Sequence, residues 1–349
     1  MQCPLGHDPW PGRRGRHRLH PVGPHPRLSL GRGLDDHLPD HRHGLYHRLA
    51  VGPDPPALHW QLRGRPVTRP FQITLTVTAE PEAQMLAPLG FDTPQSRVTG
   101  LTVTGGTRLP DVTEAKTGQT VALIRPEAES VTLTYAFDPC DAAYPEAIWQ
   151  VHDSRFTRAA EALVAEARAT APDAPPAERA RAIACATAER FTYGHPETRF
   201  TDGLDHVPHL GCGLTAGSCV DINTYFLAAL RAAGIEASYV VGYFFPAEKG
   251  DWCNDAHCWV VTRTEEVVQH WDIAHYLKLG TRDIYPALNP KPGFRAPVGF
   301  GMGLDFPQFG VEDLKLLSEP IWLCTSGARR VHTQCIRLRH PEIAPAAAE

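Results

Sequence analysis

Hydrophobic and polar residues alternate in four stretches of the chain between positions 71 and 138. The stretches are Phe71 to Val77, Val98 to Val103, Val121 to Ile124 and Val131 to Phe137. A period of two is typical of antiparallel strands, and turn residues separate the stretches. The pattern predicts a small antiparallel β-domain over residues 70–140, which we interpret as a structural partner of the rest of the chain.

Helical spacing replaces this alternation further along. Ser154 to Thr170 and Ala177 to Arg190 are Ala-rich, and the prolines between them end one helix and open the next. A third helix, almost wholly apolar, starts at Cys219. Two short strands rich in Val and Trp follow, at Asp255 to Val261 and Val267 to Asp272. Together with the β-domain, these elements predict an α+β fold.

The last part of the chain has weaker patterns. Tyr276 to Gly310 is dense in Gly and Pro, so we expect an irregular segment that either covers the site as a lid or wraps the surface. The elements expected after it are a short helix near Val311 to Leu317 and strands at Ile321 to Thr325 and Val331 to Leu338. We therefore predict a core over 150–285 that residues 286–349 complete.

Residues 1–69 differ in style from everything that follows. They hold eleven Arg and five Asp but no Lys or Glu, half of the 18 histidines, and no periodic apolar pattern. Too little apolar surface is available to offset the entropy of ordering, so a folded domain is not expected. The stretch is either a disordered tail or a non-native extension from outside the reading frame. Its histidines lack a fixed geometry for holding a metal.

Composition narrows the class of protein. The chain is 42% hydrophobic and 21% charged, which is typical of soluble globular proteins, and no apolar run is long enough to span a membrane. The first residues lack the apolar segment of a signal peptide, and nine cysteines without a disulfide-framework spacing fit reduced thiols. We therefore expect a cytoplasmic location and no membrane partner. Residues 1–69 carry +6 (eleven Arg minus five Asp) although the whole chain carries −5, so the acidic remainder argues against nucleic-acid binding.

A candidate nucleophile stands at the start of the third helix. Ser218 is a good N-cap, and Asp221 can complete a capping box, which puts Cys219 in the first turn. Free backbone N–H groups and the positive end of the helix dipole favour a thiolate there. The pKa of the Cys219 thiol should therefore be depressed.

A candidate base and an orienting acid lie on the predicted hairpin. If the hairpin is centred on Thr264-Glu265, His257 falls directly opposite Asp272. Asp272 can then accept the ring N–H of His257 while the other ring nitrogen faces the thiol. We interpret His275 as a structural or solvent-facing group.

Four short motifs around these residues form a set. They are Gly217-x-Cys219, Val240-Val241-Gly242-Tyr243, His257-x-Trp259-Val260 and Trp271-Asp272. Their order and gaps, 38 positions from Cys219 to His257 and 15 from there to Asp272, resemble the transglutaminase-like superfamily of cysteine acyl-transfer enzymes, which has a papain-like fold. The resemblance covers Phe156 to about Tyr276. In two departures from the family, Cys258 stands where a small residue is usual, and Ile-Ala-His follows Asp272 in place of the commoner Pro-Thr.

The resemblance implies a function and a set of roles. Cys219 would be the nucleophile, His257 the base and acid, and Asp272 the orienting carboxylate of an enzyme that acts on a peptide or protein amide through a thioester. No metal or organic cofactor is implied. We favour water over a primary amine as the acyl acceptor, because bacterial-looking members of the superfamily are more often peptidases or amidases than cross-linking enzymes.

Two other functions stay open. In the first, the site holds a peptide without catalysis, and Cys219 reacts no faster than an ordinary thiol. In the second, the protein binds zinc through a set drawn from Cys212, Cys219, Cys253, His257 and Cys258. The spacing of that set is not the CxxC of a zinc knuckle, and Cys258 is expected on the opposite face of its strand from His257.

Overall fold

Antiparallel strands and a smaller number of helices make up the described part of the chain. The computed structural model describes residues 69–339 except 81, 266, 325–326 and 332–335. The predicted extension over 1–69 therefore lies outside the described residues, apart from its last position. None of the helices within 69–339 is long and apolar enough to cross a membrane. The fold is α+β, as the sequence predicts.

Two sheets contain the N-terminal strands. One has the order β11-β19-β1-β7-β3, and the other has the order β18-β17-β2-β6-β4 with β5 paired to β6. Their strands are β1 (Phe71–Thr78), β2 (Gln84–Pro88), β3 (Ser96–Thr104), β4 (Gly106–Arg108), β5 (Val112–Thr113), β6 (Thr120–Pro126), β7 (Ser130–Pro139), β11 (Trp252–Cys253), β17 (Ile321–Cys324), β18 (Gly327–Arg330) and β19 (Ile336–Arg339). The four predicted strands correspond to β1, β3, β6 and β7. Strand β2 escapes prediction because four of its five residues are buried in a row, so its sequence does not alternate.

Alternation along β1 explains why the first sheet has an apolar face. Phe71, Ile73, Leu75 and Val77 are buried, whereas Thr76 and Thr78 are exposed. The Phe71 ring stacks on Phe137 of the paired strand β7 with centroids 4.5 Å apart. This apolar face shares one core cluster with residues of two strands from the half of the chain that carries the candidate site, Tyr243 and Phe245 of β10 and Ala296 and Val298 of β14.

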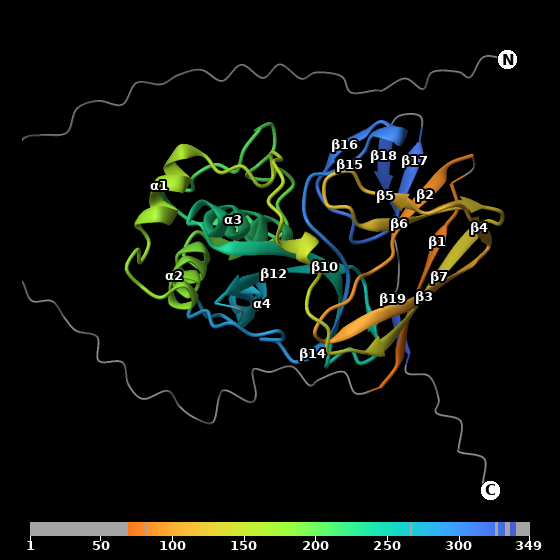
Figure 1. Ribbon diagram of the computed structural model, residues 1–349, viewed down its shortest axis with the longest axis horizontal. Helices are drawn as coiled ribbons and strands as arrows, with labels where there is room; N and C mark the ends of the chain where they lie inside the picture. The colour runs from red at the N-terminus through yellow and green to blue at the C-terminus, as the bar shows by residue number, and fades with distance from the viewer. Residues whose placement is uncertain (1–68, 81, 266, 325–326, 332–335, 340–349) are drawn as a thin grey trace, which may run out of the picture. The chain divides into compact units, whose positions relative to one another are not determined.

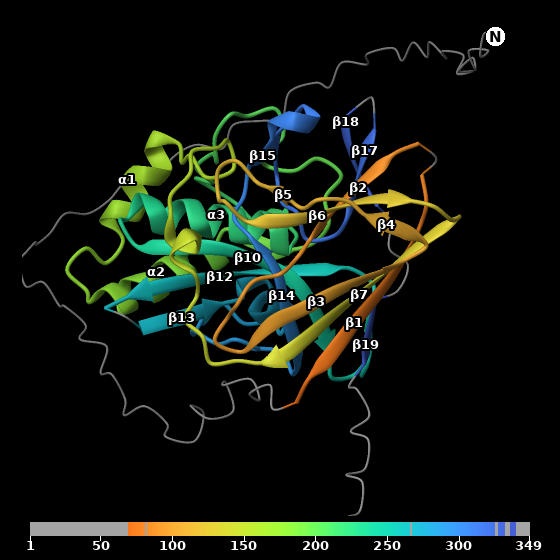
Figure 2. The same ribbon diagram turned by 45° about the vertical axis from the view of Figure 1, so that its right-hand side comes forward.

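A third sheet, with the order β13-β12-β10-β14, carries the candidate site. Its strands are β10 (Glu236–Pro246), β12 (Ala256–Thr264), β13 (Val267–Trp271) and β14 (Gly293–Phe300), and the helices of this half are α1 (Glu161–Ala169), α2 (Pro176–Ala188), α3 (Cys219–Ala232) and α4 (Ile273–Lys278). Helix α3 packs on β10 and β12, and α1 and α2 pack on α3 (Figures 1 and 2). Eleven of the fourteen residues of α3 are buried, so the helix forms the centre of this half.

The first two predicted helices, α1 and α2, are present but begin at other residues than predicted. Helix α1 begins at Glu161 rather than near Ser154, because residues 154–157 form a turn in which the Ser154 carbonyl accepts from Thr157 N–H. Helix α2 begins at Pro176, as expected for proline at the first helical position. The remaining short elements are the 3-10 turns η1 (Glu146–Trp149) and η2 (Pro307–Phe309) and the strands β8 (Phe191–Tyr193), β9 (Thr215–Gly217), β15 (Leu304–Phe306) and β16 (Val311–Leu314).

The prediction of an irregular segment over Tyr276 to Gly310 was wrong for its second half. Strand β14 lies there and pairs with β10, with a register shift between Val241 and Gly242. Pro297 is tolerated because β14 is at the edge of its sheet and the irregularity removes one ladder position. The helix expected near Val311 to Leu317 was also wrong, since Val311–Leu314 is strand β16 paired with β15.

The C-terminal strands join both halves of the molecule. Strand β14 completes the site's sheet, whereas β17 pairs with β2 and β19 pairs with β1. Of the expected strand at Val331 to Leu338, residues 332–335 lie outside the described part and the rest overlaps β19. The predicted division into 70–140, 150–285 and 286–349 stays a prediction.

Candidate active site

Cys219 is the first residue of helix α3. Before it, β9 runs parallel to β8, and Gly217 leaves space for the ring of Phe191, which a Cβ at position 217 would meet at 2.8 Å. The predicted capping box is present: the Asp221 carboxylate accepts from Ser218 N–H at 2.9 Å and from the Ser218 hydroxyl at 2.7 Å. Arg199 also donates to Asp221 at 2.7 Å, so this buried acid is occupied in fixing the helix start. Cys219 itself is 9% exposed.

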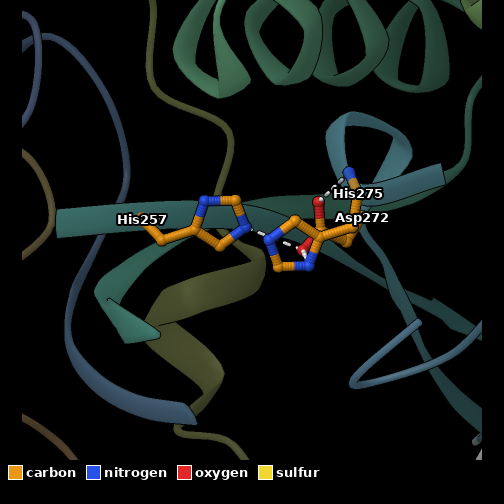
Figure 3. Close-up of side chains that lie close together, drawn as sticks. All are labelled: His257, Asp272 and His275. Carbon is orange, nitrogen blue, oxygen red and sulfur yellow. Dashed lines mark hydrogen bonds and ion pairs between the residues drawn. The ribbon is translucent and has the colours of Figure 1, made fainter. Parts of the chain in front are cut away.

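His257 and Asp272 meet, although not through the predicted register. Strand β12 pairs with β13 so that Val260 faces Trp271 and Thr264 faces Val267, which would put position 259 opposite Asp272. The predicted turn centre was wrong by one residue, and the pairing is therefore shifted by two. A shift of two keeps both side chains on one face. His257 Nε2 and Asp272 Oδ2 are 2.7 Å apart, with His257 7% exposed and Asp272 fully buried (Figure 3).

Two further residues complete the surroundings of Asp272: Arg295, which the sequence did not single out, and His275, which we interpreted as a structural or solvent-facing group. Arg295 of β14 donates from Nη2 to Asp272 Oδ2 at 2.6 Å, and its side chain is 1% exposed. His275 of α4 donates its backbone N–H to Oδ1 at 3.1 Å and brings Nδ1 within 2.9 Å of Oδ2. The rings of His257 and His275 stack with centroids 4.4 Å apart and planes 6° apart (Figure 3). The motif Asp272-Ile-Ala-His275 was a usable signal, because an N-cap residue and the third helical position face each other.

Charge and burial set the ionisation of the group. Burial alone lowers the pKa of His257, but the charges of Asp272 and Cys219 outweigh it and raise that pKa to about 9. Burial would raise the pKa of Asp272, yet His257, His275 and Arg295 hold it well below its usual range. A hydrogen bond from Cys258 and the positive charge of His257 bring the pKa of the Cys219 thiol well below its ordinary value, against the effect of burial. Burial lowers the pKa of His275 to about 4, so this ring is neutral. The shifts at Cys219 and His257 both favour a thiolate paired with an imidazolium over a neutral thiol paired with a neutral imidazole.

Sequence comparison finds a family whose model matches this part of the chain. Residues 163–271 match the family model of the transglutaminase-like superfamily. This segment is similar to that superfamily, and we call it the transglutaminase-like core. The matched segment contains Cys219 and His257 and ends one position before Asp272. No curated protein gives a match.

Two solved structures resemble the chain. One is a candidate cysteine protease from Cytophaga hutchinsonii, with a TM-score of 0.44 and 11% identity over 78% of this chain and 96% of that chain. The other is the periplasmic domain of TgpA from Pseudomonas aeruginosa, with a TM-score of 0.32 and 16% identity over 64% of this chain and 92% of that chain.

Cys258, one of the two departures from the family pattern, lies in the transglutaminase-like core beside the candidate nucleophile. It shares a core cluster with Cys219, whereas its neighbour Trp259 belongs to a different cluster. Asn223, one helical turn after Cys219, donates to the Cys258 carbonyl at 3.0 Å and lies 3.5 Å from its sulfur. Burial and the contact with Cys219 raise the pKa of the Cys258 thiol. Cys258 is therefore the protonated partner of the pair.

Metal ligands gather at one place among the described residues, and it is not the predicted cysteine set. Ligand atoms of His257, Asp272 and His275 lie within 4.8 Å of one another. The shared carboxylate oxygen already accepts from Arg295, whose positive charge opposes a cation there. In the cysteine set, Cys212 is exposed and Cys253 packs in the β-rich core, apart from Cys219. The arrangement therefore fits a hydrogen-bonded acid–base group better than a metal centre.

Proposed function

We propose that the protein is a cysteine acyl-transfer enzyme that hydrolyses peptide or amide bonds. In this proposal Cys219 is the nucleophile, His257 is the base and acid, and Asp272 orients the ring. The observation that carries the proposal is the buried 2.7 Å contact between His257 Nε2 and Asp272 Oδ2, beside a thiol at a helix start whose pKa is well below its ordinary value.

The reaction follows from which ring nitrogen is occupied. Because Nε2 bonds Asp272, Nδ1 is the nitrogen free to exchange a proton at the thiol side. The Cys219 thiolate attacks the carbonyl carbon, and the imidazolium gives its proton to the departing amine nitrogen as the C–N bond breaks. An acyl-thioester and a neutral imidazole remain. The imidazole then takes a proton from water, whose oxygen attacks the thioester and releases the acid and the Cys219 thiolate, so the thiolate–imidazolium pair is restored.

The developing oxyanion needs donors. Backbone N–H groups in the first turn of a helix have no partner within that helix, and Cys219 N–H is one of them. This N–H points along the positive end of the α3 dipole, where negative charge is stabilised. We therefore assign Cys219 N–H as one oxyanion donor. The low exposure of Cys219 and His257 favours an extended or flexible segment as the substrate over a folded surface.

The test is a search for products. Wild-type protein, Cys219→Ala and a control Cys212→Ala, which removes an exposed thiol, are each incubated with a peptide library and a primary amine, and products are identified by mass spectrometry. We expect cleaved peptides with wild type and the control and none with Cys219→Ala. If amine-modified peptides exceed cleaved ones, the proposed reaction is transamidation and not hydrolysis. Equal products from all three proteins would remove Cys219 from the mechanism.

A further inference from the structure

Arg295 is a buried guanidinium that pairs with one anionic side chain in the described part of the chain. Its side chain is 1% exposed, and Nη2 donates to Asp272 Oδ2 at 2.6 Å. Its Cζ lies 4.4 Å from the centre of the Trp259 ring. Among the described residues, Nε and Nη1 have no hydrogen-bond partner. Since burying a guanidinium with unused donors is costly, the ion pair with Asp272 is the interaction that retains it there.

Strand pairing places Arg295 close to the candidate site. Arg295 is paired with Phe244 of β10, and Gly242, two residues earlier on β10, is paired with His257 of β12. The Phe244 ring contacts both imidazoles, with centroids 5.9 Å from His257 and 4.4 Å from His275. Arg295 therefore reaches Asp272 from a third strand, β14.

We propose that Arg295 is a positioning residue of the triad, which holds Asp272 Oδ2 toward His257 Nε2 and cancels the charge of the carboxylate. The inference rests on the proposed function and deepens it. With Arg295 present, the charges of Asp272 and Arg295 cancel. The charges of the His257 imidazolium and the Cys219 thiolate also cancel. Without Arg295, the negative charge of Asp272, next to the His257 imidazolium, is left uncompensated.

The uncompensated charge has a defined effect on titration. It favours protonated His257 and disfavours the Cys219 thiolate, so both pKa values move upward. The other titratable groups around the cluster are Cys258 from β12, His270 from β13, His275 from α4, Tyr144 before η1 and Tyr193 from β8. Burial keeps His270 and His275 neutral, with pKa values of about 3 and about 4, and raises those of both tyrosines, so none of them replaces the lost positive charge.

The experiment measures alkylation of Cys219 by iodoacetamide against pH, read by mass spectrometry of the peptide that contains it. It needs no substrate. The proteins are wild type, Arg295→Met, Arg295→Lys and the control Arg337→Met, which removes an exposed arginine paired with exposed Asp251. For Arg295→Met we expect the midpoint of the alkylation curve to rise by about one pH unit, with alkylation about tenfold slower below the midpoint. For Arg295→Lys and Arg337→Met we expect the wild-type midpoint.

Each outcome bears on one proposal. An activated wild-type curve that is unchanged in Arg295→Met overturns the role of Arg295 and leaves the proposed function intact. A wild-type midpoint near the ordinary thiol value of about 8.5 contradicts the proposed function instead. If Arg295→Met does not fold, Arg295→Lys decides, because a midpoint that rises although the positive charge is retained contradicts charge cancellation.

Discussion

At Asp272, one carboxylate oxygen receives the contacts of three basic side chains. Oδ2 lies 2.7 Å from His257, 2.9 Å from His275 and 2.6 Å from Arg295. A neutral amide at this position would keep the shape but lose the charge. Among the charges around His257, that of this carboxylate raises the pKa of the ring most.

The first prediction concerns the alkaline limit of activity. The pKa of His257 is raised to about 9, chiefly by Asp272 against burial, so the imidazolium that protonates the leaving amine is present below pH 9 and lost above it. We expect the rate of the proposed hydrolysis to fall as pH rises through about 9. In Asp272→Asn, the pH at which the rate falls (the alkaline limb of the pH–rate curve) should move down toward the ordinary histidine pKa of about 6.5. Rates measured from pH 5 to 10 test this, and a limb at the same pH in both proteins would contradict it.

A second prediction follows from the thiol contact beside Cys219. A hydrogen bond from Cys258 is the largest effect that lowers the pKa of Cys219. Cys258→Ala removes the donor, so the alkylation midpoint of Cys219 should rise while the His257 limb stays in place. Cys185→Ala, whose thiol instead contacts the Ile284 carbonyl, serves as the control and should leave the midpoint unchanged. A midpoint that Cys258→Ala does not move would show that the contact has no electrostatic role.

At the scale of elements, the site depends on how closely β10 approaches β14. Gly242 of β10 is paired with His257 on one side and with Pro297 on the other. A Cβ at this position would meet the Ala296 carbonyl oxygen at 2.0 Å and Pro297 Cα at 2.8 Å. Both contacts are with backbone, so only a separation of the strands could accommodate a side chain.

The third prediction is that Gly242→Ala destabilises the protein by about 2 kcal/mol or more, since overpacking against backbone forces a shift of the strand. The free energy of unfolding is measured by chemical denaturation. Gly100→Ala in β3 is the matched control, because a Cβ there meets nothing within 4 Å, and it should change stability by less than about 0.5 kcal/mol. Similar losses in the two variants would argue against the close approach.

Local sequence patterns were enough to select Cys219, His257 and Asp272 as candidate site residues. They were not enough to select Arg295. A cap, a helix and a hairpin are each specified by neighbouring residues, and an error of one residue at the turn preserved the shared face of His257 and Asp272. Arg295 sits in Gly293–Phe300, whose Gly and Pro hide the strand pattern. Its partner lies 23 residues earlier and is reached through a pairing between β14 and β10 that no local pattern encodes.

At the scale of the molecule, the first and last described strands are neighbours. Strand β19 pairs with β1, and Ile336 and Leu338 bury their side chains in the β-rich core while Arg337 points outward. The same core contains Tyr243, Ala296 and Val298 from the site's sheet. Because the two strands share this core, a loss of packing at β19 also affects β14, the strand that carries Arg295.

The fourth prediction tests this connection. Ile336→Ala should cost about 2–4 kcal/mol, the range for truncating a buried aliphatic side chain. Arg337→Ala on the next residue should change stability by less than about 0.5 kcal/mol. Denaturant unfolding of both variants gives the comparison. Equal, small changes would mean that β19 is not part of the cooperative structure.

The pairing of β19 with β1 also bears on how the protein is made. A ribosome that has finished β1 and β7 must still synthesise about two hundred residues before residue 336 emerges, and until then one edge of β1 has unpaired backbone groups. Helix α3 and its sheet can form earlier, apart from β14. During synthesis the nascent chain therefore exposes an open strand edge for about 10–40 seconds, at translation rates of roughly 5–20 residues per second. That interval is when a chaperone would bind.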